Sequence, residues 1–285
     1  MKFMDHKIII HGGFFSESGT NSEIKLAKQE ALSEIVKKSY TYLDSHSALE
    51  TSVYAVALLE DCELFNAGIG SQIQSDGKIR LSAGLMDGSS GKFSGVINIQ
   101  DVKNPIQIAE KLISYDDRVL RGSGALDFAR KNGFGFFNPE TKQRREEYEK
   151  KLNASARMGT VGCVALDKNG HIAAATSTGG KGFEIPGRVS DSATVAGNFA
   201  NQFAGISCTG VGEDIVTAGL SVKIVTRVID GMTLKEATLK SFEELKEIDG
   251  FAGIIGISSL GEVFHLDSHP YMVWASFDNG LSVFP

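Results

Sequence analysis

The sequence of 285 residues lacks the features of several large protein classes. It has no surplus of positive charge, because 29 lysines and arginines stand against 35 aspartates and glutamates and the formal net charge is -6. A chain of this charge has little attraction for nucleic-acid phosphates or anionic membranes. We therefore expect neither of these partners, and a small molecule or a peptide as the ligand.

Cysteines and long apolar segments are also scarce. The three cysteines, Cys62, Cys163 and Cys208, show no CxxC spacing, which argues against a disulfide framework and against a zinc knuckle. The charged N-terminus leads into only three isoleucines before Gly12, too few for the apolar region of a signal peptide. No segment approaches the roughly 20 apolar residues of a membrane span. These absences predict a reducing compartment, with the cytoplasm as the expected location.

Common catalytic motifs are missing as well. Gly68-Ile69-Gly70 lacks the third glycine of a dinucleotide fingerprint, and it follows a predicted helix instead of a strand. No G-x-S-x-G nucleophile motif occurs. His265 and His269, with Asp267 between them, could ligate a metal, but they lie at a strand end, and the favoured interpretation is that they are polar surface residues.

Capping boxes mark most of the predicted helix starts. In such a box a Ser or Thr and a Glu three residues later satisfy free N–H groups of the first turn. Three pairs have this spacing: Thr20 with Glu23, Ser47 with Glu50, and Thr233 with Glu236. Asn104-Pro105 supplies a cap and a first-turn proline for another helix. The predicted helices are one with Ile24, Ala27, Ala31 and Ile35 on one face, one ending near Glu60, and Ile106–Ile113, Glu213–Val228 and Leu234–Ile248.

Short apolar or β-branched runs predict the strands. The predicted strands are Lys7–His11, Ile79–Ala83, Val96–Ile99, Val161–Leu166 and His171–Ser177. Turn residues at 167–170 and 259–261 predict two hairpins. Blocks of helices and strands with hairpins between them indicate packed helix and sheet layers with antiparallel pairing. A doubly wound parallel sheet is disfavoured.

A polar segment, residues 134–158, separates two unequal parts of the chain. It contains Asn138-Pro139 and no clean apolar period. Its densest charged cluster, Lys142 to Lys151, mixes both signs and is typical of a solvated surface helix or a linker. We predict an exposed linker here, ending at Gly159 and Thr160.

The segment Met158–Gly180, MGTVGCVALDKNGHIAAATSTGG, places a threonine after a glycine at the start of a strand. Threonine favours strands through its β-branch, so this position alone does not indicate catalysis. A free N-terminal threonine is different, because its α-amine, whose ordinary pKa is about 7.7 to 8.0, can take the hydroxyl proton. Exposing that amine requires cleavage between Gly159 and Thr160, and glycine tolerates the strained backbone that hydroxyl attack needs.

This segment resembles the plant-type asparaginases, the isoaspartyl peptidases and the related glycosylasparaginases. Three further blocks carry the resemblance: LEDCELFNAGIGS at Leu59–Ser71, IPGRVSDS at Ile185–Ser192 and SCTGVGE at Ser207–Glu213. Met86-Asp87-Gly88 and Lys103-Asn104-Pro105 add weaker support. Ordered blocks over roughly 155 residues are more specific than one short motif.

The resemblance implies an α+β fold, the four-layer αββα sandwich of N-terminal nucleophile hydrolases. It implies a precursor that becomes an α subunit of residues 1–159 and a β subunit of residues 160–285, together in one domain. Thr160 would attack the amide of L-asparagine or of a β-aspartyl dipeptide and form an ester, which water hydrolyses to aspartate. No cofactor takes part in this chemistry. A dimer of αβ units is expected from the same resemblance.

The resemblance also assigns roles around the nucleophile. Thr178 is expected to hydrogen-bond the Thr160 hydroxyl, and the Thr209 hydroxyl and Gly210 N–H to stabilise the oxyanion. Asn66 is expected beside the nucleophile, although an asparagine before Ala-Gly is also ordinary turn chemistry.

Substrate binding is assigned to Arg188, Asp191, Gly210 and Gly212. Arg188 can hold an α-carboxylate through two parallel hydrogen bonds, and Asp191 can hold the α-ammonium group. A surface salt bridge is the alternative interpretation of an arginine and an aspartate near a turn.

The loop Leu59–Ile69 resembles the sodium-binding loop of these enzymes, in which backbone carbonyls surround a hard cation. The matching carbonyl positions are Leu59, Glu60, Cys62, Phe65, Ala67 and Ile69. Because carbonyls would do the binding, a tight loop without an ion is compatible with the same side chains.

The chain departs from the family pattern near the predicted head-group site. Ser190 and Ala193 replace a common glycine and proline, and Phe251 lies in a segment that is glycine-rich in relatives. A Phe251 ring near the pocket would narrow the site toward asparagine or line a site for larger β-aspartyl peptides. Two other functions stay open: a glycosylasparaginase, usually found in secretory compartments, and an uncleaved, inactive family member that acts as a binding protein.

Overall fold

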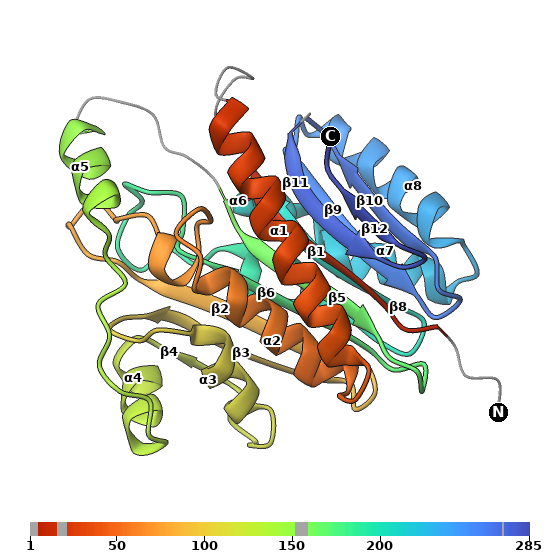
Figure 1. Ribbon diagram of the computed structural model, residues 1–285, viewed down its shortest axis with the longest axis horizontal. Helices are drawn as coiled ribbons and strands as arrows, with labels where there is room; N and C mark the ends of the chain where they lie inside the picture. Colours follow the sequence, from red (N-terminus) through yellow and green to blue (C-terminus); the bar gives the residue numbers. More distant parts are fainter. Residues whose placement is uncertain (1–4, 16–21, 152–158, 270) are drawn as a thin grey trace.

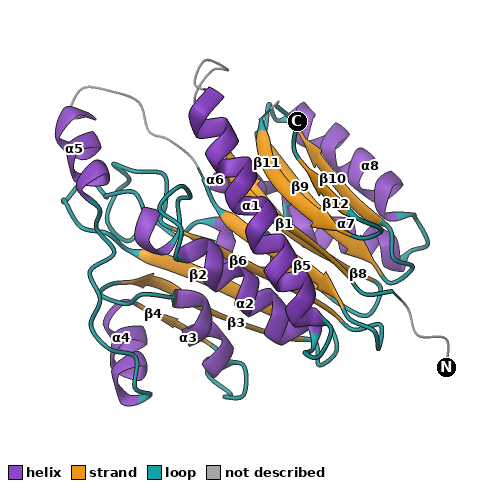
Figure 2. Ribbon diagram, viewed as in Figure 1, coloured by secondary structure: helices purple, strands orange, loops and turns teal. Residues whose placement is uncertain are grey.

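Two β-sheets packed face to face form the centre of the protein in a computed structural model that describes residues 5–15, 22–151, 159–269 and 271–285 (Figures 1 and 2). The larger described sheet has, in spatial order, β12 (Leu281–Val283), β11 (Met272–Phe277), β1 (Lys7–Phe14), β5 (Val161–Leu166), β6 (Ile172–Thr178), β2 (Leu81–Asp87), β3 (Lys92–Ile99) and β4 (Val119–Arg121). The smaller has β10 (Val263–Asp267), β9 (Ala252–Ser258), β8 (Ala204–Gly210) and β7 (Asn198–Ala200). All neighbouring strands pair antiparallel except β3 and β4.

Helices cover the outer face of each sheet. The larger sheet carries α1 (Ser22–Leu43), α2 (Ala48–Glu60) and α3 (Pro105–Leu112), with α4 (Gly122–Lys131) near its β4 edge. The smaller sheet carries α7 (Leu220–Ile229) and α8 (Leu234–Glu247). The layers therefore run helix, sheet, sheet, helix, and the predicted αββα fold is confirmed.

The central strands are buried on both faces, which explains their continuous apolar runs. In β1, Ile8 and Ile10 pack into the core between the larger sheet and its helices, whereas Ile9 packs between the two sheets with Ile255 and Ile257 of β9. This division follows from the two-residue period of a strand. Full burial of each such side chain contributes about 1.5–3 kcal/mol, so β1 and β5 form a rigid base for the segments that follow them.

Two predicted capping boxes are present in full. Ser47 and Glu50 start α2, and Thr233 and Glu236 start α8, with side-chain to backbone hydrogen bonds in both directions. Thr20, the cap predicted for the first helix, lies outside the described residues. The predicted hairpins at 167–170 and 259–261 join β5 to β6 and β9 to β10.

Asn104 differs from its predicted role as a helix cap. It precedes α3, and Pro105 begins that helix as expected, but the Asn104 side chain makes no capping hydrogen bond. Its Nδ2 instead donates to the Ala57 carbonyl at 3.3 Å and to Asp61 Oδ1 at 3.0 Å. The side chain therefore ties α3 to the end of α2.

The single helix predicted over Glu213–Val228 is wrong. Gly219 adopts φ +56° and divides the segment into α6 (Gly212–Ala218) and α7. Left-handed backbone costs glycine little, and it ends the first helix in the usual way. The break lets α6 lie beside a pocket while α7 packs on β8.

Several elements were not predicted. Helix α4 begins with Gly-Ser-Gly, which has weak helix propensity, and β4, β7 and β12 are only three residues long. Strand β11 follows the last predicted hairpin and pairs with β1. Short or glycine-containing segments of this kind form because a neighbouring element supplies their partners.

Part of the predicted exposed linker is a docked helix. Helix α5 (Lys142–Lys151) lies at one edge of the molecule in Figure 1. Arg144 Nε donates to the Gly70 carbonyl at 2.8 Å, and the Tyr148 ring stacks on Phe183 with centroids 4.9 Å apart. Of the two interpretations of this charged cluster, the surface helix describes residues 142–151, and residues 152–158 lie outside the described part of the chain.

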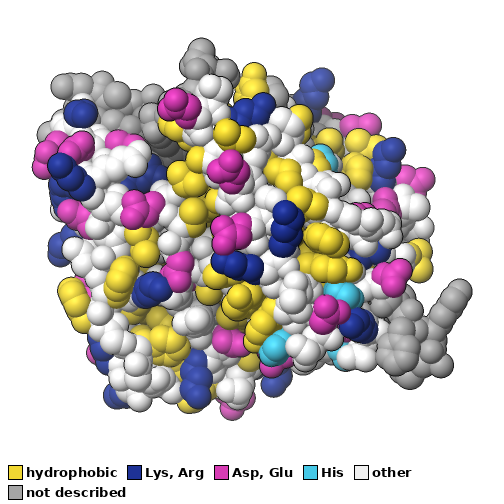
Figure 3. Space-filling model, viewed as in Figure 1, with side chains coloured by type: hydrophobic (Ala, Val, Ile, Leu, Met, Phe, Trp, Pro, Cys, Tyr) yellow, Lys and Arg dark blue, Asp and Glu magenta, His cyan; other side chains and the backbone are white. Residues whose placement is uncertain are grey.

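The surface offers no extended field of one charge on the face shown in Figure 3, where basic and acidic side chains are interspersed. Within the described ranges, no helix combines the length and apolar character needed to cross a membrane.

Candidate active site

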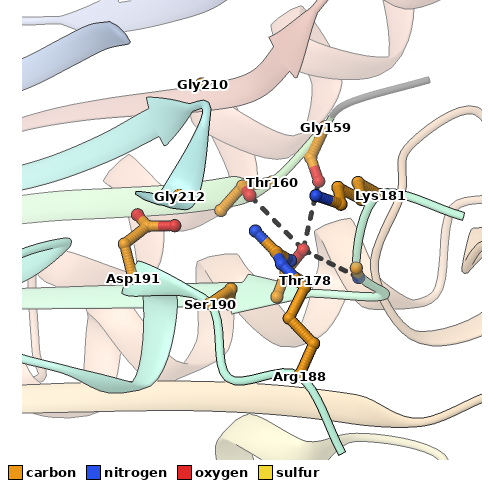
Figure 4. A pocket seen from close by; sticks show the side chains of 10 residues that line it. Gly159, Thr160, Thr178, Lys181, Arg188, Ser190, Asp191, Gly210 and Gly212 are labelled. Atoms are coloured by element: carbon orange, nitrogen blue, oxygen red, sulfur yellow. Dashed lines mark hydrogen bonds between the residues drawn. The ribbon is translucent and has the colours of Figure 1, made fainter. Parts of the chain in front are cut away.

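The β5–β6 hairpin places two threonines side by side. Its antiparallel register pairs Val161 with Ser177, so Thr160, just before β5, lies next to Thr178 at the end of β6. The Thr160 Oγ1 donates to Thr178 Oγ1 at 3.3 Å (Figure 4). The turn that fixes this register was recognisable in the sequence, and both threonines lie where they were predicted.

A small pocket surrounds this pair. It brings together segments that are distant in the sequence (Figure 4). The lining residues are Gly159, Thr160, Thr178, Gly180, Lys181, Arg188, Ser190, Asp191, Gly210 and Gly212. Most of the predicted catalytic and substrate-binding residues are in this set. Lys181 was missed, because a lysine after two glycines has no distinctive signal.

The carbonyl of Gly159 receives two hydrogen bonds. Asn66 Nδ2 donates to it at 2.7 Å and Thr178 Oγ1 at 3.1 Å. The Gly180 N–H in turn donates to Thr178 Oγ1 at 3.1 Å. The Thr160 hydroxyl therefore lies at the head of a chain of hydrogen bonds that ends on the carbonyl of its own preceding peptide bond.

Asn66 does not line the pocket, but its side chain reaches the Gly159–Thr160 junction from the loop after α2. The side chain is buried, and its Oδ1 accepts from the Gln72 N–H at 2.9 Å. Its Nδ2 also contacts the Gly180 carbonyl. Ordinary turn chemistry does not account for contacts 93 and 114 residues away in the sequence.

Gly13, near the end of β1, packs closely against the Gly159–Thr160 junction. A Cβ atom at Gly13 would lie 3.0 Å from both the backbone nitrogen and the carbonyl oxygen of Thr160. Its φ of +86° also favours glycine. The sequence analysis assigned no role to Gly13, so this contact was missed.

Thr209 and Gly210 end β8, and of these two residues Gly210 lines the pocket. The Thr209 hydroxyl is fully buried and has no hydrogen-bond partner among the described residues. A buried donor without a partner costs about 1–3 kcal/mol unless another group binds it. Gly210 has φ +141°, and a Cβ atom there would lie 2.4 Å from the Phe251 carbonyl, so only glycine fits.

Arg188 is held by two carboxylates, neither of them Asp191. Its Nε and Nη2 donate to Glu213 at 2.7 and 2.8 Å, and its Nη1 donates to Glu184 Oε2 at 2.9 Å. The hydrogen bonds from Arg188 lower the pKa of Glu213 to about 2. Arg188 therefore forms salt bridges with two glutamates and not with Asp191, and the guanidinium also lines the pocket.

Asp191 is buried beside Arg188. Desolvation raises the pKa of Asp191 to about 7, and its Oδ2 accepts no hydrogen bond from any described residue. A Cβ atom on Gly212 would lie 2.8 Å from Arg188 Nη2 and 2.9 Å from Asp191 Oδ1. A positive and an acidic group therefore face one small space that exists because residue 212 has no side chain.

Phe251 does not line this pocket. Its ring packs on Phe14 with centroids 4.4 Å apart and stacks on His269 at 4.5 Å. The expectation that its ring narrows or lines the substrate site is therefore wrong, because the neighbouring aromatic rings hold it elsewhere. Of the other departures, Ser190 lines the pocket and Ala193 is buried in the short helix Asp191–Ala193.

His265 and His269, which were considered as metal ligands, stack on aromatic rings. His265 stacks on Trp274 with centroids 3.9 Å apart, and His269 stacks on Phe251. In the described part of the chain, no group of three or more His, Cys, Asp or Glu side chains could hold a metal ion.

Comparison with known proteins places this fold and site in a family. A family model described as "Asparaginase" matches residues 4–282. An "Isoaspartyl peptidase/L-asparaginase" of Synechocystis sp. is 43% identical over 98% of this chain and 90% of its own. The "Isoaspartyl peptidase" of Escherichia coli is 37% identical over 90% of this chain and 88% of its own. The "Plant-type L-asparaginase" of Pyrococcus furiosus is 35% identical over 96% of this chain and 97% of its own.

The αββα sandwich is the fold class of the N-terminal nucleophile hydrolases. Within that class, the match over nearly the whole length shows that the chain belongs to the asparaginase family.

Proposed function

We propose that this protein is a self-cleaving amidohydrolase that releases aspartate from L-asparagine and from β-aspartyl dipeptides. One observation supports this most: Gly159 and Thr160 lie at a pocket that also contains the Arg188 guanidinium and the Asp191 carboxyl. Relatives that carry the names isoaspartyl peptidase and L-asparaginase support the same chemistry.

Self-cleavage would begin with attack of the Thr160 hydroxyl on the Gly159 carbonyl carbon. Thr178 accepts a hydrogen bond from that hydroxyl, and Asn66 and Thr178 donate to the carbonyl oxygen on which negative charge develops. The peptide C–N bond then breaks, the hydroxyl proton passes to the Thr160 nitrogen, which becomes the free α-amine, and an ester joins Gly159 to Thr160 Oγ1. Water hydrolyses that ester, which releases the Gly159 carboxylate and restores the Thr160 hydroxyl.

In the mature enzyme the α-amine of Thr160 takes the proton of its own hydroxyl, which attacks the amide carbon of the substrate. The buried Thr209 hydroxyl and the Gly210 N–H would donate to the oxyanion. The amide C–N bond breaks, and ammonia or an amino acid leaves with a proton. Water then releases aspartate from the ester on Thr160.

Arg188 and Asp191 would bind the α-carboxylate and α-ammonium groups of the substrate beside Gly212. Fixing the head group fixes the distance from it to Thr160. Glutamine has one more methylene, so its amide carbon would be displaced from the nucleophile, and a displacement of about 1 Å can cost about 10²-fold in rate. An α-peptide lacks the free α-carboxylate on the aspartyl unit.

The substrate range tests this function directly. We expect kcat/KM for a β-aspartyl dipeptide to be at least as high as for L-asparagine, because the Phe251 ring does not line the pocket. We expect kcat/KM for L-glutamine to be at least about 10²-fold lower. Steady-state kinetics with the three substrates decides. Comparable turnover of glutamine would contradict the head-group assignment, and activity on asparagine alone would mean that the leaving-group side is closed.

The substrate affinity should depend on the ionisation of Asp191. Because its pKa is raised to about 7, the carboxyl is largely protonated at pH 6 and holds an ammonium group poorly, whereas it is ionised at pH 8. KM for asparagine should therefore be about tenfold higher at pH 6 than at pH 8. The Thr160 amine titrates in the same range but acts mainly on kcat. In Asp191→Asn, KM should be high and independent of pH; a flat wild-type KM would refute the assignment.

We also propose that the loop 59–69 binds sodium through the six backbone carbonyls named above. The loop is compact: a Cβ atom on Gly68 would lie 2.3 Å from the Glu60 carbonyl oxygen, and one on Gly70 would lie 1.8 Å from the Phe65 carbonyl oxygen. A compact loop of this kind would suit a monovalent cation that orders the segment carrying Asn66. The cation would stabilise the loop and take no part in the reaction.

Replacing sodium with tetramethylammonium should lower the thermal midpoint. A ligand present at one hundred times its Kd adds about 2.7 kcal/mol to the free energy of unfolding, and each kcal/mol is worth about 2–4 °C in a protein of this size. Differential scanning calorimetry at constant ionic strength measures the change. An unchanged thermal midpoint would contradict the proposal that sodium stabilises the loop.

The dimer of αβ units stays a prediction, which light scattering tests.

A further inference from the structure

Arg188 has hydrogen-bonding capacity left over after its contacts with Glu184 and Glu213. A guanidinium has five N–H bonds. Three are used in these two ion pairs, so one N–H on each of Nη1 and Nη2 has no acceptor among the described residues. Nη2 lies beside the space at Gly212 that Asp191 Oδ1 also faces. The remaining pair of N–H bonds is therefore suited to a carboxylate that enters this space.

Glu184 is the more firmly held of the two carboxylates. It is 5% exposed, whereas the Glu213 side chain is 51% exposed. Its Oε2 accepts from Arg188 Nη1 and from the Lys181 N–H at 3.1 Å, and its Oε1 accepts from Gln74 Nε2 at 2.6 Å. A Cβ atom on Gly180 would lie 2.3 Å from Oε1, so the glycine makes room for this carboxylate.

The amide of Gln74 can point only one way. Its Oε1 accepts from Arg80, which is itself paired through two nitrogens with Asp76 at 3.0 and 2.8 Å. Its Nε2 must therefore face Glu184, which then presents only acceptors to Arg188. The sequence of donors and acceptors from Asp76 to Arg188 is fixed at every step.

We propose that Glu184 is a positioning residue that orients the Arg188 guanidinium and thereby sets the affinity of the pocket for the α-carboxylate of its substrate. The inference rests on the proposed function. An arginine side chain has many rotamers, and a buried partner removes that freedom before the substrate arrives. Glu213 accepts two hydrogen bonds from the same group, but solvent screens this contact because the Glu213 side chain is half exposed.

Glu184→Gln should raise KM for asparagine about tenfold and leave kcat within about twofold, as expected for the loss of one hydrogen bond to a charged group. The N–H₂ of an amide at this position would face either Arg188 and the Lys181 N–H, or Gln74 Nε2. All of these groups are donors, so at least one hydrogen bond to residue 184 is lost in either orientation. The matched control, Glu213→Gln, should raise KM less than about threefold, because that contact is exposed.

The effect should be specific to the α-carboxylate. L-aspartate contains this group and β-alanine is the same molecule without it, so the two ligands report on Arg188 separately. In Glu184→Gln the Kd of L-aspartate, measured by calorimetry, should rise about tenfold, and that of β-alanine should stay within about twofold. An equal loss for both ligands would overturn the inference, because a general distortion of the pocket would then explain it.

A double variant restores the pattern of donors and acceptors. With Gln74→Glu added to Glu184→Gln, the new amide donates to residue 74 and accepts from Arg188, and residue 74 still accepts from Arg80. We expect the Kd of L-aspartate to return to within about threefold of the wild-type value. Unchanged aspartate affinity in the single variant, or no recovery in the double variant, would overturn the positioning role.

These binding measurements need no turnover. A failure of the proposed function would appear separately, as a wild-type protein that does not hydrolyse asparagine. Glu184→Gln and the double variant should still cleave into two fragments, because the contacts at the Gly159–Thr160 junction do not include Glu184. Cleavage would show that these variants fold.

Discussion

Thr160→Ala should leave the purified chain uncut and lower asparagine hydrolysis by about 10⁴-fold or more. The substitution removes the hydroxyl that attacks the Gly159 carbonyl, and without cleavage the α-amine that serves as the base is never released. Loss of a nucleophile in other hydrolases has effects of this size or larger. Denaturing gel electrophoresis and an ammonia-release assay measure the two consequences.

Thr160→Ser is the matched control for this variant. Serine keeps the hydroxyl and lacks only the methyl group, so slower cleavage at the same bond and measurable hydrolysis are expected. Full hydrolytic activity in Thr160→Ala would contradict the assignment of the nucleophile. Cleavage of Thr160→Ala at the normal rate would show that another group cuts the chain.

Arg188→Ala should lower kcat/KM for asparagine and for β-aspartyl dipeptides by about 10²- to 10³-fold. Removing one partner of a buried, hydrogen-bonded charge pair costs about 2–5 kcal/mol, and here the substrate carboxylate loses its partner while Glu184 is left buried. Both substrates present the same α-carboxylate, so the two losses should be similar. Steady-state kinetics gives the comparison.

Self-cleavage of Arg188→Ala separates substrate binding from folding. The variant should still form two fragments, because the hydrogen bonds that hold the Gly159–Thr160 junction do not involve Arg188. Arg188→Lys should recover only part of the activity, since an ammonium group cannot reproduce the planar pair of N–H donors. Near-wild-type kcat/KM in a cleaved Arg188→Ala protein would contradict the head-group assignment.

The positions of Thr160 and Thr178 relative to each other were predictable because local rules determine their neighbourhood. Two apolar runs joined by a turn at 167–170 specify a hairpin, and its register alone places Thr160 beside Thr178. The αββα arrangement required more than local rules. Blocks of helices and strands indicated packed layers, and the resemblance supplied their number.

The surroundings of Arg188 were not predictable in the same way. Glu184 looks like any acidic residue in a polar loop, and its burial depends on Gln74, which lies 110 residues earlier in the sequence. Phe251 shows the opposite case, because a bulky residue in a glycine-rich segment suggested a change in the pocket. The rings of Phe14 and His269 hold it outside that pocket, and no sequence pattern records such contacts.

The predicted helix boundaries were wrong where a glycine interrupts a helical apolar pattern. The run after Glu213 keeps a helical pattern through Gly219, whose left-handed backbone breaks it into two helices. Helix α5 has almost no apolar face, so its charged sequence indicated a linker or a solvated helix. Its docking uses an arginine and a tyrosine that reach neighbouring backbone and Phe183.

The intact mass of the purified wild-type protein tests the central claim most directly. The account predicts two fragments, residues 1–159 and residues 160–285, with the second beginning Thr-Val-Gly on N-terminal sequencing. A single full-length mass after prolonged incubation at neutral pH, or a fragment that begins at any other residue, would contradict both the boundary and the threonine mechanism.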